Sequence, residues 1–94
     1  PDVVGYSADK QWIYVVEAVT SFGPLNAYRH VELRKLLAEV NAEGVIYVTA
    51  FPSRDKVFRQ YVPEISWETE VWIASEPDHL IHFDGKRFLG PYGD

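Results

Sequence analysis

Two carboxylates stand at the ends of apolar runs, and they are the side chains best placed to do chemistry. Asp2 opens a short run that begins at Val3, and Glu17 lies near the end of a longer run over residues 11–20. Burying an acid among β-branched residues is costly unless a cation or hydrogen-bond donors compensate it. If the two runs form a hairpin, the start of the first strand faces the end of the second, which brings Asp2 and Glu17 together.

Such a pair of acids indicates a site for a hard divalent cation. Mg²⁺ takes oxygen ligands and keeps several waters, and a main-chain carbonyl at the strand end would add a third protein oxygen. A metal held in this way supports hydrolysis of phosphodiesters. The spacing of Pro1-Asp2 and Glu17 resembles the Pro-Asp-(Asp/Glu)-X-Lys motif of nucleases, but two acids about 15 residues apart also occur by chance.

The pattern of the whole chain predicts the elements that must position these acids. Apolar runs and turn residues predict strands over 2–6, 11–20, 45–51 and 67–74, then a hairpin of 79–83 and 86–89 around Asp84-Gly85. Helices are expected from about residue 25 to 40 and from Ser53, as N-cap, to Pro63. This order predicts an α/β domain in which a mixed β-sheet is flanked by helices.

The first predicted helix should send cations toward Glu17. Its apolar stripe consists of Leu33, Leu36, Leu37 and Val40. Continued toward the N-terminus, the same stripe passes through Arg29 and His30. Since this end of the helix follows the strand that carries Glu17, both side chains should point to the same place.

Composition limits the class of protein. The chain has 94 residues, of which 47% are hydrophobic, and forms one domain over residues 1–94. It contains no cysteine, which excludes disulfides and Cys-ligated zinc and favours a cytoplasmic setting. No apolar run is long enough to span a membrane. The absence of methionine favours a piece of a longer protein, and the net charge of −5 argues against this segment holding DNA by itself.

Longer stretches of the sequence resemble a known family. They are Glu17-Ala18-Val19-Thr20-Ser21-Phe22-Gly23-Pro24, Val45-Ile46-Tyr47-Val48-Thr49-Ala50-Phe51-Pro52, the block from Trp67 to Phe83, and Arg87-Phe88-Leu89-Gly90-Pro91-Tyr92. They look like the C-terminal catalytic domain of the BsuBI/PstI family of type II restriction endonucleases, and the resemblance covers essentially the whole chain.

The resemblance implies a magnesium-dependent endonuclease with a restriction-endonuclease-like core that cuts double-stranded DNA at the palindrome CTGCAG. A palindromic target implies a homodimer in the intact enzyme. Family members act beside a modification methyltransferase and carry a further N-terminal, helical, DNA-binding region. By position, Asp2 and Glu17 match the two metal-binding acids of the superfamily, and the carbonyl of Ala18 matches its third ligand.

One position departs from the superfamily motif. Lys is expected two residues after the second acid, where it orients the attacking water, but this chain has Val19. Arg29 is a candidate for the missing cation, because a guanidinium suits phosphate. His30 could act as a base, and Ser21 or Thr20 could hold a water. The alternative for Arg29 is an ion pair that only neutralises Glu17.

Two other functions remain compatible with these residues. The missing Lys and the acidic charge fit a non-catalytic scaffold or interaction module. A structure-selective repair or recombination nuclease could share the fold and the acids. The resemblance favours the restriction endonuclease.

Overall fold

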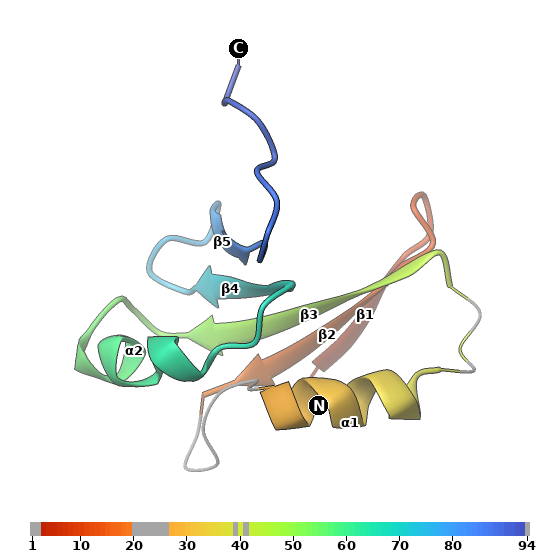
Figure 1. Cartoon of the computed structure of the whole chain (residues 1–94), viewed down its shortest axis with the longest axis horizontal. Coiled ribbons are helices and arrows are strands. Elements are labelled where there is room, and N and C mark those ends of the chain that lie inside the picture. Colours follow the sequence, from red (N-terminus) through yellow and green to blue (C-terminus); the bar gives the residue numbers. More distant parts are fainter. Residues whose placement is uncertain (1–2, 20–26, 39, 41, 94) are drawn as a thin grey trace.

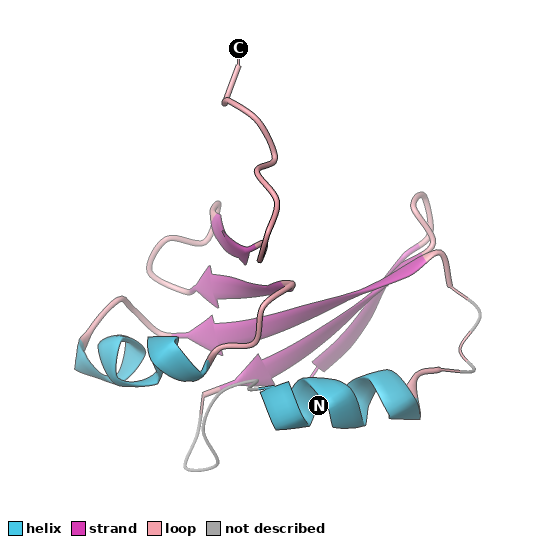
Figure 2. Cartoon of the chain, in the orientation of Figure 1, coloured by secondary structure: helices cyan, strands magenta, loops and turns pink. Residues whose placement is uncertain are grey.

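The computed structural model describes residues 3–19, 27–38, 40 and 42–93, which form one sheet with helices packed on it (Figures 1 and 2). In chain order the elements are β1 (Val3–Ser7), β2 (Trp12–Ala18), α1 (Ala27–Leu36), β3 (Gly44–Phe51), α2 (Lys56–Tyr61), the 3-10 turn η1 (Val62–Glu64), β4 (Thr69–Ile73) and β5 (Leu80–Phe83).

The strands lie side by side in the order β1-β2-β3-β4-β5. The three inner strands are parallel, whereas β1 and β5 run antiparallel to their neighbours at the two edges. The parallel pairs are joined through α1 and through α2 with η1, as parallel strands require a crossover connection. The predicted mixed sheet of an α/β domain is therefore confirmed.

Both helices cover the same face of the sheet. Side chains alternate between faces along a strand, and the register pairs Val15 with Tyr47 and Phe51 with Ile73. One buried cluster joins this face to Leu33 of α1, and a second joins it to the segment around α2 and η1. The first cluster contains Ile13, Val15, Leu33 and Tyr47; the second contains Phe51, Ile65, Val71 and Ile73.

The opposite face of the sheet is lined by apolar and aromatic side chains, and we call it the open face. It carries Trp12, Tyr14 and Val16 of β2, Ile46 and Val48 of β3, Trp72 of β4 and Leu80 of β5. Neither α1 nor α2 lies over this side (Figure 1).

Helix α1 is shorter than predicted, and its inward stripe is different. It ends at Leu36 rather than near residue 40. His30 and Leu33 are buried and Leu37 packs against the first cluster, while Leu36 is 69% exposed. The prediction of an inward Leu36 was wrong, because positions 30, 33 and 37 define the buried stripe and residue 36 lies outside it.

Two local predictions were also wrong. The N-cap of α2 is Asp55 rather than Ser53: its carboxylate accepts hydrogen bonds from the backbone N–H groups of Val57 and Phe58, and the Ser53 hydroxyl donates to it. These donors lower the pKa of Asp55, with the bond from Phe58 as the largest cause. Residues 86–89 form no strand, since β5 pairs with β4 and the chain then leaves the sheet as an exposed arm (Figure 1).

No helix among the described ranges is both long enough and apolar enough to cross a membrane.

Candidate active site

Glu17 lies near the carboxyl end of β2, on the face that α1 covers. Its neighbours two and four residues earlier, Val15 and Ile13, belong to the first buried cluster. Its side chain is only 16% exposed. The strand therefore carries a carboxylate at the margin of an apolar layer, as the alternation of the sequence predicts.

A guanidinium from α1 compensates this carboxylate. Arg29 Nε donates to Glu17 Oε2 at 3.2 Å, and Arg29 Nη2 donates to Glu17 Oε1 at 3.0 Å. Such a two-point arrangement is the strong form of a charge-assisted hydrogen bond. The bond to Glu17 is the main cause that raises the pKa of Arg29, and Glu32 contributes from Oε1 at 3.7 Å from Nη1. This geometry confirms the prediction that Arg29 points toward Glu17. The same geometry is expected if Arg29 only neutralises Glu17 in an ion pair.

The pairing of β1 with β2 is relevant to where Asp2 lies relative to Glu17. Val3 pairs with Val16 and Val4 pairs with Val15, so the described pairing reaches the residue before Glu17. Asp2, Ser21 and Thr20 lie outside the described residues. Their predicted roles at the site therefore stay predictions.

The two residues after Glu17 differ in their surroundings. Ala18 is exposed and pairs with Ala50 of β3, at the last register position of the two strands. Val19 packs against the second buried cluster, and its backbone N–H donates to the Ala50 carbonyl at 3.0 Å. The side chain at the motif Lys position thus belongs to the apolar core, where an ammonium group would be costly to place.

His30 occupies a buried position between α1 and the sheet. Its Nδ1 lies 2.9 Å from Ser66 Oγ, and its ring meets the edge of Tyr47 with centroids 4.4 Å apart. Burial is the main cause that lowers the pKa of His30, and the charge of Arg34 lowers it further, against the opposing charge of Glu68. These contacts show that the His30 side chain is part of the packing between α1 and the sheet. Its predicted role as a base near Glu17 stays a prediction.

The lowered pKa of His30 predicts a pH dependence of stability. The unfolded chain binds the proton near pH 6.5, while the folded chain binds it only at a lower pH. The free energy of unfolding should therefore fall as pH drops through about 6.5, with a slope of at most about 1.4 kcal/mol per pH unit from this group. Denaturant titrations between pH 7.5 and 5 are expected to show a shallower slope for His30→Phe, which keeps a ring beside Tyr47.

The exposed imidazole of His79 offers the matched control for that experiment. His79→Phe should follow the wild-type slope. If the free energy of unfolding falls equally for wild type and His30→Phe on acidification, protonation of His30 does not contribute to the pH dependence of stability.

The described residues alone do not complete a metal site. No group of three or more His, Cys, Asp or Glu within the described ranges is arranged to hold a metal ion. The donors that the structure does describe, the Glu17 carboxylate and the Ala18 carbonyl, are oxygens and so have the chemistry that Mg²⁺ prefers.

Two polar features were not predicted from the sequence. Thr49 pairs with Glu17 across β2 and β3 and is completely buried. A polar residue inside an otherwise apolar strand was the available signal. Glu70 and His82 are in direct contact across β4 and β5 on the other face, and their sequence gave no signal because the pairing of these strands was not predicted.

Comparisons with known proteins agree with this fold. Residues 1–86 match the family model of the BsuBI/PstI restriction endonuclease domain. The type II restriction enzyme BsuBI of Bacillus subtilis is 56% identical over 92 residues, which cover 98% of this chain and 28% of that protein. The type II restriction enzyme AplI of Arthrospira platensis is 37% identical over 89 residues, which cover 95% of this chain and 27% of that protein.

A solved structure gives the same result in three dimensions. The SdaI restriction endonuclease superposes with a TM-score of 0.88 at 47% identity, over all of this chain and 29% of the other. The chain thus spans less than a third of each of these relatives. The sheet, the sequence match over residues 1–86 and this superposition lead to one assignment: the chain belongs to the BsuBI/PstI restriction endonuclease domain family.

Proposed function

We propose that this chain is the catalytic domain of a type II site-specific deoxyribonuclease, in which a divalent metal assists hydrolysis of phosphodiesters in double-stranded DNA. The observation that carries the proposal is Glu17, a largely buried strand-end carboxylate bound by Arg29 within a restriction endonuclease domain. A largely buried carboxylate beside a cation supplies oxygen donors of the kind that metal-assisted hydrolysis uses.

Mg²⁺ would be held by the carboxylates of Asp2 and Glu17 and by the carbonyl of Ala18. The donor set is all oxygen, and the pairing of Val3 with Val16 supports the convergence of the two acids, because these are the chain neighbours of Asp2 and Glu17. When bound, the metal would lower the pKa of a water molecule and stabilise charge on the phosphate.

Arg29 would supply the cation that the motif expects at Val19. Its high pKa keeps the guanidinium charged at any pH at which the enzyme works. Its side chain is 35% exposed, so part of it remains accessible to a phosphate while the rest contacts Glu17. We propose that this side chain orients the scissile phosphate and screens its charge.

The wider activity is proposed from the family resemblance and the composition of the sequence. The target would be CTGCAG, the intact enzyme would be a homodimer in the cytoplasm, and this chain would be the C-terminal part of a longer enzyme. The chain spans about 28% of BsuBI and 29% of SdaI, which supports its being one part of a longer enzyme. The net charge of −5 supports it too, because DNA binding then depends on other parts of the protein.

Plasmid cleavage by the intact enzyme tests the proposal. A plasmid with one CTGCAG sequence should be linearised in the presence of Mg²⁺, and EDTA should stop the reaction. A plasmid with that site altered at one base pair is the matched control and should stay intact. Cleavage that follows DNA structure instead would favour the repair nuclease, and the absence of cleavage would favour the scaffold, for which the Arg29–Glu17 pair and Val19 already give a structural reason.

A further inference from the structure

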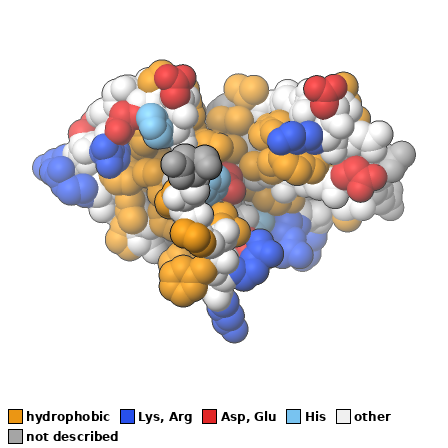
Figure 3. Space-filling view, turned by 90° about the horizontal axis from the view of Figure 1, so that it is seen from above, with side chains coloured by type: hydrophobic (Ala, Val, Ile, Leu, Met, Phe, Trp, Pro, Cys, Tyr) orange, Lys and Arg blue, Asp and Glu red, His pale blue; other side chains and the backbone are white. Residues whose placement is uncertain are grey.

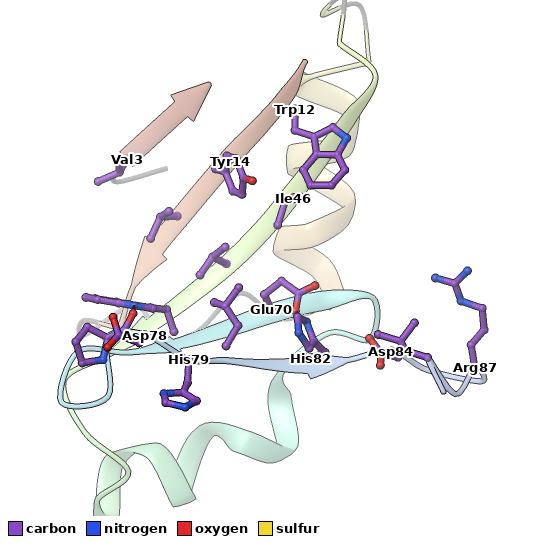
Figure 4. Close-up of a pocket in the computed structure, with 16 residues that line it drawn as sticks. Val3, Trp12, Tyr14, Ile46, Glu70, Asp78, His79, His82, Asp84 and Arg87 are labelled. Atoms are coloured by element: carbon purple, nitrogen blue, oxygen red, sulfur yellow. Dashed lines mark hydrogen bonds and ion pairs between the residues drawn. The ribbon is translucent and has the colours of Figure 1, made fainter. Parts of the chain in front are cut away.

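The carboxyl ends of the three parallel strands lie at one edge of the sheet, which we call the carboxyl edge (Figure 1). Glu17 lies near the end of β2, the segment 52–55 follows β3, and the connection 74–79 joins β4 to β5. Backbone hydrogen bonds continue the pairing of β3 with β4 past the strand ends, so the last two segments are neighbours. Figure 4 shows His79 at this edge, at the other end of the sheet from Trp12. Ligands of open α/β sheets bind outside the carboxyl ends of the strands, so DNA held at Glu17 also passes these two segments.

A two-point ion pair joins the segments that follow β3 and β4. Arg54 Nε donates to Glu76 Oε2 at 2.6 Å, and Arg54 Nη2 donates to Glu76 Oε1 at 2.7 Å. The two side chains are 57% and 40% exposed, and a pair so exposed contributes little to stability. The pair does fix the direction of the guanidinium. It uses two of the five N–H donors of Arg54, which leaves three for a further acceptor.

The backbone that carries Arg54 is fixed independently of this pair. Asp55 caps α2 by accepting hydrogen bonds from two backbone N–H groups at the start of the helix. Ser53, on the other side of Arg54, donates its hydroxyl to Asp55 Oδ2 at 3.0 Å. Because its two chain neighbours are bonded to each other, Arg54 projects from a closed turn.

Positive charge gathers around this turn, although the chain as a whole carries −5. Arg54, Lys56 and Arg59 are all exposed. Figure 3 shows a group of Lys and Arg side chains at the end of the molecule where α2 lies. The two acids bonded to this segment are already engaged, since Asp55 caps the helix and Glu76 binds Arg54. Contacts to phosphate depend on such local groups of Lys and Arg, whatever the net charge of the domain.

We propose that Arg54 contacts a phosphate of the duplex away from the scissile bond, and that Glu76 orients the guanidinium toward it. Arg54 follows Thr49 by five residues, and Thr49 pairs with Glu17. At about 3.3 Å per residue and about 4.8 Å between strands, the backbones of Arg54 and Glu17 lie within roughly 20 Å. That distance corresponds to about six base pairs at 3.4 Å each. The contact binds and orients the DNA, and the inference rests on the proposal that this domain cuts double-stranded DNA.

The salt dependence of DNA binding by the intact enzyme tests this contact. Affinity for a duplex with one CTGCAG sequence is measured by fluorescence anisotropy in EDTA, which prevents cleavage. Each phosphate contact contributes about 0.9 to the slope of log affinity against log salt concentration. For each subunit on the DNA, Arg54→Met should reduce the slope by about 0.9 and weaken binding about 5- to 10-fold at 0.1 M salt.

Two further variants separate a DNA contact from a link between the two segments. Arg54→Lys should recover the slope, because lysine keeps the charge although it cannot form the two-point bond with Glu76. Lys35→Met removes one positive charge from the last turn of α1 and is the matched control. It should leave both the slope and the affinity nearly unchanged.

Duplexes in which single phosphates are replaced by uncharged methylphosphonates locate the contact. One replacement away from the scissile position should weaken binding by the wild-type enzyme and have no further effect on Arg54→Met. If Arg54 only links the two segments, both Arg54 variants would keep the wild-type slope, and every replacement would weaken Arg54→Met as it weakens wild type. Either result would overturn the inference.

These measurements do not depend on cleavage. An enzyme that shows the coupling but does not cut DNA with Mg²⁺ would contradict the nuclease proposal alone. An enzyme that cuts without the coupling would contradict the role of Arg54 alone. Circular dichroism checks that each variant folds.

Discussion

Replacement of Glu17 by Ala in the intact enzyme is expected to lower the rate of DNA cleavage by about 10³-fold or more. The change removes a carboxylate that we propose as a metal ligand, and metal-assisted stabilisation of the transition state is worth several kcal/mol, at about 1.4 kcal/mol per tenfold in rate. The measurement is the initial rate of linearisation of a one-site plasmid with Mg²⁺ in excess. Glu17→Gln should be nearly as inactive, because it keeps the shape and removes the charge.

Glu32 provides the matched control for this change. It is the other acid beside Arg29, with Oε1 at 3.7 Å from Nη1, but it lies on the exposed side of α1. Glu32→Gln should keep nearly the full rate. Thermal unfolding of each variant separates loss of chemistry from loss of fold. A Glu17→Gln enzyme that folds and still cuts at the wild-type rate would show that this carboxylate does not hold the metal.

The arrangement around Glu17 could be predicted because it follows from local rules. Alternation along β2 assigns Glu17 to the covered face, and helical periodicity places Arg29 near the strand end. The same rules predict a mixed sheet, since a hairpin and two crossovers must follow from the order of the elements. These features depend on sequence spacing alone, and the structure confirms them.

Other features depend on which elements become neighbours, and spacing does not contain that information. Strand β5 pairs with β4 rather than with residues 86–89, so the contact of Glu70 with His82 could not be predicted. Leu36 looks apolar and inward on a helical wheel, yet the position of α1 on the sheet turns it outward. Likewise, α1 and the α2–η1 segment pack on the same face of the sheet, which no single segment encodes.

Val19 shows how the position of the motif Lys can be occupied by an apolar side chain while a cation still lies beside Glu17. In this chain Val19, which directly follows β2, packs against the second buried cluster, so an apolar side chain stands where the motif expects a charged one. A cation is nevertheless present beside Glu17, delivered by α1 from twelve residues further along the chain. The motif is defined along one strand, whereas a cation beside the acid can also be supplied by a neighbouring element, and α1 supplies the guanidinium of Arg29 there.

Arg29→Met is expected to lower the cleavage rate at saturating Mg²⁺ by about 10²- to 10³-fold, the usual cost of removing one group that stabilises charge in a transition state. Arg29→Lys should recover part of that loss, because it restores the charge without the two-point geometry seen with Glu17. A Mg²⁺ titration of the rate distinguishes this role from simple neutralisation. If Arg29 only neutralised Glu17, it would compete with the metal, so Arg29→Met would need less Mg²⁺ and would reach the wild-type rate at saturation.

Arg34, an exposed residue further along α1, is the control for loss of positive charge on this helix, and Arg34→Met should keep nearly the full rate. Because Arg29 also binds Glu17 in the metal-free protein, its removal should lower the concentration of Mg²⁺ at half-saturation in either case, by the loss of that competition. Only the rate at saturation therefore decides between the two roles. If Arg29→Met reached the wild-type cleavage rate at saturating Mg²⁺, the guanidinium would serve only to neutralise Glu17 in the folded protein. The cation that replaces the motif Lys would then have to come from elsewhere in the enzyme.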